Sequence, residues 1–388
     1  MSHRLVVVGA GYAGLQAAKR LARLLRRHDV TITLVNASDR FVERVRLHQL
    51  AAGQSWAGGG SSLRQQLNDP TVRLVVGRVT AIDAVSRTVA VAVDTVPASI
   101  GYDTLVYALG SGARLDDVPG ASVHAYAVAD FGQATRLRDR VSQVMSSGGT
   151  VAVVGAGLTG LETAAELAES CPTLRVRLLT GADDVGVGLM PRARRHLRYA
   201  LDRLGVSVHT KAVVAEVRED GLDTVDGVAF AAHTVVWTTG FRVPELARAA
   251  GFATDEDGRM LVDATLRSIS HSDVYAVGDA AAGLSVSGAP GRMSCQSALA
   301  MGRGVAGAIA ARLAGGAGEE PPPVRIGYVF TNISLGRRDG VVQFTHADDS
   351  PRRFVLTGRA AAAFKETVVR STVRKSRGEY WGGTTCSG

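Results

Sequence analysis

Residues 4–25 read RLVVVGAGYAGLQAAKRLARLL, and this stretch decides how the chain begins to fold. Residues 5–8 form a short uncharged apolar run, as expected of a strand buried on both faces. Gly9, Gly11 and Gly14 follow as G-x-G-x-x-G, and then an apolar stripe at helical spacing: Leu15, Ala18, Leu21 and Leu25. The first glycine permits a tight turn, the second lets the backbone approach a pyrophosphate, and the third lets helix and strand pack closely. The stretch therefore predicts a strand–turn–helix that binds a dinucleotide.

Residues 150–170, TVAVVGAGLTGLETAAELAES, repeat this design with Gly155, Gly157 and Gly160. One glycine loop of this kind is a weak signal, but two loops, each between a predicted strand and a predicted helix, indicate two dinucleotide sites. This duplication is the strongest functional signal in the chain. It predicts an α/β protein with two Rossmann-like domains.

Two further predicted strands end where the adenosine moieties would be held. Strand 30–36 ends at Asn36, where dinucleotide folds usually carry a carboxylate; an amide bonds a ribose hydroxyl without a charge. Strand 175–180 ends at Thr180, again without an acid, and three arginines follow it: Arg192, Arg194 and Arg195. They suit a 2′-phosphate, which slightly favours NADPH, but they also suit a solvated helix face. The choice between NADH and NADPH therefore stays open.

The composition is that of an ordered α/β protein of two or three domains, with 388 residues, 46% hydrophobic and 21% charged. The net charge is +8, but the basic residues are scattered along the chain, which disfavours nucleic-acid binding. We expect no leader peptide, because residues 5–8 lead straight into the glycine loop, and no apolar run is long enough to span a bilayer. We therefore predict a cytoplasmic protein, with contact to the inner face of the membrane as its closest approach to lipid.

The three cysteines, Cys171, Cys295 and Cys386, form no C-x-x-C pair. This spacing excludes a disulfide scaffold, most zinc sites and the redox dithiol of thioredoxin-reductase-like and lipoamide-dehydrogenase-like enzymes. We predict no metal site, and the roles of the three thiols stay open.

Residues 38–54, SDRFVERVRLHQLAAGQ, are dense in Arg, His and Gln where a plain crossover would be apolar. We interpret them as a loop and helix over the redox end of a cofactor; the side chains that would face it are Arg44, Arg46, His48 and Gln49. A solvated basic helix face is the alternative. Residues 73–93 alternate apolar and polar side chains, which predicts an antiparallel hairpin or meander.

Three other predicted buried strands end in residues suited to a ligand. Strand 105–108 ends in small residues through Ala108 and Gly110, and the strand within 233–245 ends at Gly240. Small residues are expected where a backbone passes close to another group. The third strand ends at Gly278 and Asp279, where an acid suits a polyol hydroxyl.

The C-terminal part begins after a boundary at residues 315–323, GGAGEEPPP, and we expect strands followed by a terminal helix. In residues 360–377 an apolar stripe, Ala360, Phe364, Val368 and Thr372, is flanked by Lys365, Arg370, Arg374 and Lys375. A basic amphipathic helix lies on anionic lipid, packs on its own protein or joins a dimer. These three interpretations stay open, as does the oligomeric state.

These motifs together resemble the two-dinucleotide-binding-domain flavoproteins, which are glutathione-reductase-like, over nearly the whole chain. Within them the chain most resembles the type II NADH dehydrogenases and the apoptosis-inducing-factor-like NAD(P)H:quinone reductases. The resemblance implies an α/β fold of two Rossmann-like domains plus a small C-terminal α+β segment. It divides the chain into three units. The FAD-binding domain has two parts, residues 1–113 and 255–320, and the NAD(P)H-binding domain between them covers residues 114–254. The C-terminal segment, residues 321–388, would make dimer or membrane contact.

The resemblance also implies roles for particular residues. Gly9, Gly11 and Gly14 would hold the FAD pyrophosphate, and Asp279 of YAVGDAA its ribityl chain. LVYALGS and WTTGF resemble the family's A-T-G and W-T-A-G motifs, and FVERVRLHQLAAG its loop over the isoalloxazine, with Arg44 where bacterial members often carry Lys. Glu162 matches the family's G-x-E, close to nicotinamide and flavin. The family's quinone-side A-Q-x-x-x-Q appears as CQSALA, in which only Gln296 survives.

The predicted chemistry is hydride transfer from NADH or NADPH to FAD, and electron transfer on to a quinone or quinone-like small acceptor. Glu162 would position the nicotinamide, and Arg44 or the N-terminus of the helix that holds Gln296 would stabilise negative charge on the flavin. His48 and Gln49 would guide protons or the acceptor. The alternatives are a ferredoxin or rubredoxin reductase with a small acidic partner, a sulfide:quinone-type enzyme that uses Cys171 or Cys295, and a flavoprotein whose NAD(P)H-dependent state controls partner binding.

Overall fold

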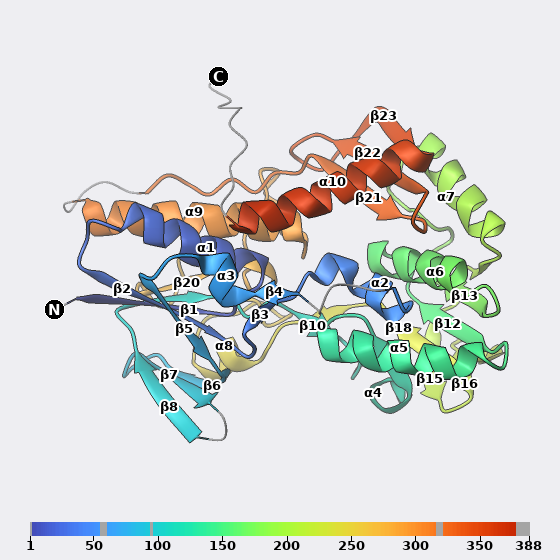
Figure 1. Ribbon diagram of the computed structural model, residues 1–388, viewed down its shortest axis with the longest axis horizontal. Coiled ribbons are helices and arrows are strands. Elements are labelled where there is room, and N and C mark those ends of the chain that lie inside the picture. Colours follow the sequence, from blue (N-terminus) through green and yellow to red (C-terminus); the bar gives the residue numbers. More distant parts are fainter. Residues whose placement is uncertain (1, 55–59, 94–95, 316–320, 378–388) are drawn as a thin grey trace.

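A computed structural model describes residues 2–54, 60–93, 96–315 and 321–377, and Figure 1 shows its two parallel sheets side by side. The first sheet has the order β20-β9-β1-β2-β5. Its strands, all parallel, are β1 (His3–Val8), β2 (Val30–Asn36), β5 (Val72–Val76), β9 (Thr104–Tyr107) and β20 (Val274–Ala276). Val8 pairs with both Val35 and Tyr107, so these three strands end together at one edge of the sheet.

Helices α1 (Tyr12–Leu24) and α9 (Cys295–Ala314) pack side by side on one face of this sheet (Figure 1). The stripe predicted for the first helix is buried, since Leu15, Ala18 and Leu21 are fully inaccessible to solvent. The 3-10 helix η3 (Gly278–Ala280) joins β20 to the region beneath α9. The first glycine loop, η3 and the start of α9 therefore meet at the carboxyl edge of the sheet.

The prediction for residues 73–93 was wrong in its first part. Residues 73–76 belong to β5, which lies parallel to β2, and only the following strands are antiparallel: β6 (Arg78–Asp83), β7 (Thr88–Val93) and β8 (Val96–Gly101). β5 is an edge strand whose Leu74 and Val75 are only partly buried. A half-covered edge strand alternates like an antiparallel one, which explains the misinterpretation.

The second parallel sheet has the order β11-β18-β12-β13-β14. Its strands are β11 (Ala125–Ala127), β12 (Thr150–Val154), β13 (Arg175–Leu179), β14 (Ser207–His209) and β18 (Thr234–Trp237). The helices α5 (Phe131–Met145), α6 (Leu158–Ser170) and α7 (Pro191–Arg203) surround it, and a small antiparallel sheet adjoins it: β15 (Val214–Arg218), β16 (Gly221–Thr224) and β17 (Ala229–Ala231). The two sheets confirm the predicted α/β fold with two Rossmann-like units.

Short elements connect these layers. On the way from β2 to β5 the chain forms β3 (Arg40–Phe41), η1 (Arg44–Arg46), α2 (Leu47–Ala51), β4 (Ser61–Ser62) and α3 (Leu63–Leu67). Between and after the sheets lie β10 (Gly112–Ala113), α4 (Ala121–His124), β19 (Phe241–Arg242) and α8 (Leu246–Ala249). α2 contacts both α5 and α6, so the segment that leaves the first sheet reaches the helices of the second.

The C-terminal segment is a three-stranded antiparallel sheet followed by a long helix: β21 (Phe330–Ser334), β22 (Gly340–Thr345), β23 (Pro351–Thr357) and α10 (Gly358–Arg377). Figure 1 shows α10 along the top of the molecule, and it contacts this sheet, α1 and α3. β21 also contacts α6, and α7 contacts β22 and β23. This segment therefore packs against helices of both parallel sheets. None of the helices in the described ranges combines the length and the apolarity needed to cross a bilayer.

Candidate active site

The first glycine loop has the backbone that a dinucleotide site needs. Gly9 has a φ of +97°, and a Cβ on it would lie 2.3 Å from the carbonyl oxygen of Ala108. A Cβ on Gly14 would lie 1.9 Å from the carbonyl oxygen of Gly9. At Gly11, by contrast, no described atom lies within 4 Å of that position, and no described side chain caps the helix α1 that begins there. The loop thus has free N–H groups and open space together, which fits the pyrophosphate of FAD.

The second glycine loop has the same design. A Cβ on Gly160 would lie 1.8 Å from the carbonyl oxygen of Gly155, whose φ is +102°. Gly157 has no described neighbour within 4 Å, and none of the described side chains caps the N-terminus of α6. The Thr238 hydroxyl donates to the carbonyl oxygen of Val154 at 2.7 Å and holds the loop from the next strand. These residues fit the pyrophosphate of a nicotinamide dinucleotide.

Several of the predicted flavin-site residues come together beside the first loop. Asp279 accepts a hydrogen bond from the Ser111 hydroxyl at 2.6 Å, and its carboxylate lies 3.6 Å from the guanidinium of Arg44. Arg44 also lies 3.7 Å from the Cβ position of Gly110. Gly278, with a φ of +74°, packs on α1 at the side chain of Ala13. One acid and one cation, from segments far apart in the sequence, therefore meet at the carboxyl edge of the first sheet.

Two predicted residues are held by the backbone. The Asn36 side chain accepts from the Ala10 N–H at 2.9 Å and donates to the carbonyl oxygen of Ser38 at 2.8 Å, so its amide orders the glycine loop. The Gln296 side chain accepts from the Val329 N–H at 2.9 Å and donates to the carbonyl oxygen of Phe330 at 3.4 Å. Gln296 therefore fixes the chain that leads into β21, next to the N-terminus of α9.

The predicted nicotinamide-side residues lie at the ends of their strands. Thr180 is buried directly after β13, and its hydroxyl accepts from the Ala182 N–H at 3.3 Å. Gly240, with a φ of +73°, packs against the Arg114 side chain. Of the three arginines considered for a 2′-phosphate, Arg194 lies 4.0 Å from Asp184, while Arg192 and Arg195 are exposed.

Glu162 belongs to a group of buried charges that joins three parts of the chain. It accepts a hydrogen bond from the Ser334 N–H at 2.9 Å and forms an ion pair with Lys365 of α10, in which each side chain is 11% exposed. The Nδ1 atom of His48 lies 3.9 Å from its other carboxylate oxygen. Helix α6, helix α2 and the C-terminal segment therefore meet at one carboxylate.

A second carboxylate lies one turn further along α6. Glu166 is fully buried, accepts from the Gln54 amide at 2.6 Å and lies 3.6 Å from the guanidinium of Arg337. Glu169, on the same face, accepts from the backbone N–H of Arg337. The three glutamates thus bind the loop between β21 and β22 along one stripe of α6. We call His48, Glu162, Glu166, Arg337 and Lys365 the interface cluster.

Burial changes the proton affinities in the interface cluster. It raises the pKa of Glu166 to about 7, against the attraction of the Arg337 cation. Burial and the positive charge of Arg46 lower the pKa of Lys365 to about 7. Burial also holds the pKa of His48 well below its usual value, together with three nearby cations: Lys365, Arg337 and Arg46. An acid and a base that both titrate near neutral pH suit proton transfer.

The structure corrects the interpretation of the terminal helix. The predicted stripe was Ala360, Phe364, Val368 and Thr372, with Lys365 beside it; the buried side chains are Ala361, Lys365, Val369 and Thr372. The buried face is shifted because Glu162 neutralises Lys365, so that a cation takes a place that hydropathy gives to an apolar residue. Arg46 likewise pairs with Glu366 of this helix at 2.8 Å and does not reach Asp279 as Arg44 does.

We expect Glu166→Gln to flatten the dependence of stability on pH. The folded-state pKa of Glu166, about 7, lies above its unfolded value of 4.5, so its contribution is complete below pH 4.5 and is lost as the pH rises through 7. The shift corresponds to about 3 kcal/mol at most. Urea unfolding from pH 4.5 to 8 should therefore show a smaller fall in the free energy of unfolding for the variant. Glu169→Gln, on the same helix face, controls for loss of any carboxylate there, and an unchanged slope in Glu166→Gln would contradict the assignment.

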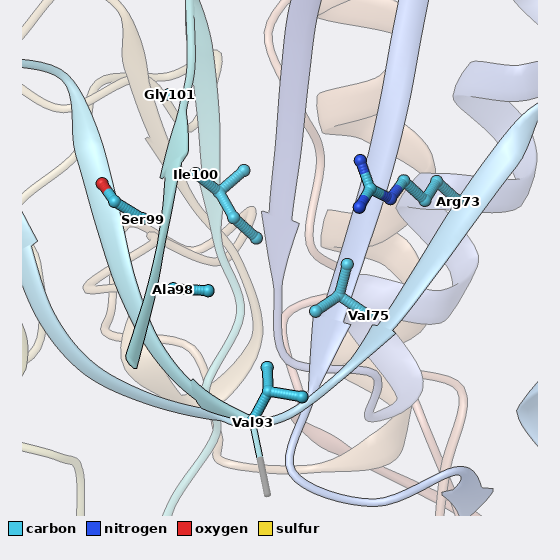
Figure 2. Close-up of a pocket in the computed structure, with 7 residues that line it drawn as sticks. All are labelled: Arg73, Val75, Val93, Ala98, Ser99, Ile100 and Gly101. Atoms are coloured by element: carbon cyan, nitrogen blue, oxygen red, sulfur yellow. The ribbon is translucent and has the colours of Figure 1, made fainter. Parts of the chain in front are cut away.

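Two of the cavities formed by the described residues lie away from the glycine loops. A groove of about 720 Å³ runs between β5 and β7–β8, and Figure 2 shows Arg73 and Val75 facing Val93 and Ile100 across it. Arg73 is the one charged side chain among the seven described residues that line it, so the groove offers no acid–base pair. A cavity of about 10 Å³, enough for one water molecule, lies beside Lys365.

Comparison with known proteins places this geometry among relatives. A family model described as pyridine nucleotide-disulphide oxidoreductase matches residues 3–302. The chain is 35% identical to an NADH dehydrogenase-like protein of Mycobacterium tuberculosis over 77% of this chain and 78% of that one. It is 26% identical to the type II NADH:quinone oxidoreductase of Staphylococcus haemolyticus over 97% and 96%. The solved structure of NDH2 from Plasmodium falciparum in complex with NADH superposes with a TM-score of 0.82 at 14% identity, over 97% of this chain and 96% of that one.

These matches bear on the predictions made above. They confirm the resemblance to type II NADH dehydrogenases, the fold class and the assignment as an oxidoreductase enzyme. They also confirm the predicted cofactor classes, FAD and NAD(P)H. The interface cluster was only partly foreseen: His48 and Glu162 were predicted, whereas Glu166, Arg337 and Lys365 were not assigned to the site. The spacing of Glu162, Glu166 and Glu169 on one face of a helix is the signal that points to Glu166; no such signal points to Arg337 or Lys365.

Proposed function

Because this chain belongs to the pyridine nucleotide-disulphide oxidoreductase family, we propose that it is an FAD-dependent NAD(P)H:quinone oxidoreductase. The names of its relatives support the acceptor class, since several are type II NADH:quinone oxidoreductases. The observation that carries the proposal is the ion pair of Glu162 with Lys365. The pair joins an acid of helix α6, beside the second sheet, to a base of helix α10 in the C-terminal segment. Both lie next to the segment η1–α2, whose His48 is 3.9 Å from Glu162 and whose Arg44 is 3.6 Å from Asp279.

When bound, FAD would supply the chemistry of accepting a hydride from NAD(P)H and passing two electrons to the acceptor. The protein must then hold charge and supply protons, because a quinone that gains two electrons also gains protons. Arg44, fixed beside Asp279, presents a positive charge at the predicted flavin site. Glu162 and Lys365 hold a proton at Oε1 and Nζ, and Lys365 can release it near neutral pH because its pKa is about 7.

Gln296 and the two glycine loops take the positioning roles in this proposal. Gly9, Gly11 and Gly14 bind the flavin dinucleotide, and Gly155, Gly157 and Gly160 the nicotinamide dinucleotide. The remaining proposed cofactor contacts are Asn36, Ala108, Gly110, Thr180, Gly240, Gly278 and Asp279. Gln296 orders the backbone before β21 through its bond to Val329. We retain the predicted division of the chain at residues 113, 254 and 320 as part of the proposal.

A membrane quinone requires contact with the lipid surface, and we propose a peripheral location through the C-terminal segment. Phe330, Phe344, Phe354 and Phe364 form a cluster of ring contacts, and Phe354 is 61% exposed. Arg352 and Arg353 beside it are exposed as well. An aromatic surface with adjacent cations suits the boundary between headgroups and acyl chains.

The first experiment follows the visible flavin band of the purified protein without oxygen. NADH or NADPH should bleach the band, and a soluble quinone should restore it; the faster nucleotide is the donor. Bleaching without recovery on quinone would overturn the quinone assignment. Recovery only with a small acidic redox protein, with a rate that falls steeply with salt, would favour the ferredoxin or rubredoxin reductase alternative.

The role of Lys365 is tested by two substitutions that separate its charge from its proton. Lys365→Arg keeps the pairing with Glu162 but does not release a proton. We expect it to slow recovery of the flavin band by about tenfold, and no more, because Glu162 remains to hold a proton at the site. Lys365→Met should slow recovery similarly and also lower the melting temperature, because it leaves Glu162 buried with one partner fewer. Lys211→Met, at an exposed lysine, is the control. A Lys365→Arg protein with wild-type recovery from pH 6 to 9 would remove Lys365 as a proton donor.

A further inference from the structure

The ring of His48 lies between two carboxylates on successive turns of α6. Its Nδ1 atom is 3.9 Å from Glu162 Oε2, and its Nε2 atom is 3.9 Å from Glu166 Oε2. The side chain is only 4% exposed. Nε2 of His48 and Oε2 of Glu166 are both buried, and neither has a hydrogen-bond partner among the described residues. The two atoms face each other at a distance that a small movement closes, while Oε2 also lies 3.6 Å from the guanidinium of Arg337.

The charges around the ring favour its neutral form. Three cations approach from three elements, Arg46 from η1, Lys365 from α10 and Arg337 from the loop between β21 and β22, and burial acts in the same direction. Glu162 and Glu166 oppose them from α6. A neutral imidazole carries one N–H, so it donates to one carboxylate and must accept from the other. Each tautomer of His48 therefore corresponds to a proton on one particular glutamate.

We propose that His48 is a tautomeric proton relay from Glu166 to Glu162. The proton on Nδ1 moves to Oε2 of Glu162, and the proton on Oε2 of Glu166 moves to Nε2, so that one bond to hydrogen forms on the ring as the other breaks. The ring stays neutral throughout, and the net result is one proton moved along α6. The inference rests on the proposed function, in which Glu162 and Lys365 share a proton that Lys365 releases when the acceptor is reduced, and the relay replaces that proton.

The far end of this relay is close to solvent. Arg337 lies 3.6 Å from Glu166 Oε2, and 34% of its side chain is exposed, whereas Glu166 itself is fully buried. One side chain therefore separates Glu166 from bulk water. Gln54 holds the other oxygen of Glu166 at 2.6 Å, so Oε2 is the atom that faces both His48 and Arg337. A movement of the Arg337 side chain would let a water molecule reach Oε2 and reprotonate Glu166 after each turnover, since the guanidinium itself does not give up a proton.

The first test reads the ring directly, using nitrogen-15-labelled histidine and NMR of the whole protein at pH 7. His48→Gln identifies the His48 signal among the nine histidines of the chain. The relay requires a neutral ring whose tautomer populations change in Glu166→Gln. A doubly protonated ring in the wild type, or a signal that does not respond to Glu166→Gln, would overturn the proposal whatever the enzyme's activity.

The second test measures recovery of the flavin band on a soluble quinone in ordinary and heavy water, with bleaching by NAD(P)H in the same sample as reference. We expect His48→Gln and Glu166→Gln each to slow recovery by about tenfold and to reduce its solvent isotope effect. The matched controls are His196→Gln, which breaks a 2.7 Å contact to Asp339 across the same interface, and Glu169→Gln. Both controls should recover within about twofold of wild type, since neither lies between two proton carriers.

The outcomes separate the relay from the function on which it rests. Wild-type recovery rates and isotope effects in both His48→Gln and Glu166→Gln would overturn the relay and leave the quinone assignment intact. A wild-type protein that quinone fails to reoxidise would instead overturn the proposed function, while the histidine spectra still decide the state of the ring. Melting temperatures identify a slow variant that has merely lost structure, in which case the other variant decides.

Discussion

Gly11→Val is expected to give a folded protein that does not retain FAD. The backbone at Gly11 has a φ of −71°, which valine adopts without strain, and no described atom lies within 4 Å of the added Cβ. The protein itself therefore has room for the side chain. The valine side chain would, however, cover the free N–H groups at the start of α1 and leave no room for the pyrophosphate. Loss of two hydrogen bonds to a charged group, at about 1.5–3 kcal/mol each, weakens binding by about 100-fold or more.

The measurement compares the visible spectrum of the purified variant with its far-ultraviolet circular dichroism. A colourless protein with the wild-type circular dichroism is the expected result, and equilibrium titration with FAD gives the loss of affinity. Gly14→Val is the contrasting variant, because its Cβ would lie 1.9 Å from the Gly9 carbonyl oxygen and should damage the fold itself. A Gly11→Val protein that purifies with bound flavin would show that the first loop does not hold the pyrophosphate.

The parts of this molecule that could be predicted from sequence are those whose geometry is determined by one short stretch of the chain. Each glycine loop fits within one strand, one turn and the start of one helix, so the spacing of Gly9, Gly11 and Gly14 contains the geometry. The ends of β9 and β20 were likewise predictable, because a strand buried on both faces must stop where its apolar run stops. The predicted contacts of these residues with the cofactors stay predictions, as do the three domain boundaries.

The interface cluster could not be assembled from sequence because its members come from four separate segments. His48 is 114 residues before Glu162, and Lys365 lies 203 residues after it. Lys365 is one of only four lysines, and in an amphipathic helix its charge predicts a place at the edge of the apolar face. Lys365 is buried only because the Glu162 carboxylate lies against α10 at this position. Hydropathy ranks each side chain alone, and this pair is stable only as a pair.

The proposed nucleotide site and the proposed acid–base groups share one element, helix α6. Its uncapped N-terminus at Gly157 belongs to the proposed site for the nicotinamide dinucleotide, and its face of Glu162, Glu166 and Glu169 binds the C-terminal segment. In this proposal an anion at the N-terminus and cations along the side act on the same rigid body. Any movement of α6 on nucleotide binding would change the distances from its carboxylates to His48 and Lys365 together.

The second large effect is expected at the start of this helix, in Gly157→Val. The backbone there has a φ of −70°, no described atom lies within 4 Å of the added Cβ, and the protein should again fold normally. Because the first loop is untouched, the variant should purify yellow, with FAD bound. Its dissociation constant for NAD(P)H should rise by about 100-fold or more, from the same loss of hydrogen bonds to a charged pyrophosphate.

Titration of the flavin band with NADH and NADPH measures this loss, and dithionite is the control because it bleaches a bound flavin without using the nucleotide site. The two valine variants form a crossed pair: one should lose the colour, and the other should keep the colour and lose its response to nucleotide. A Gly157→Val protein that bleaches at wild-type NAD(P)H concentrations would move the donor site away from the second loop. A colourless Gly157→Val protein would show that the two sites fold as one unit, and that the duplication in the sequence does not make them independent.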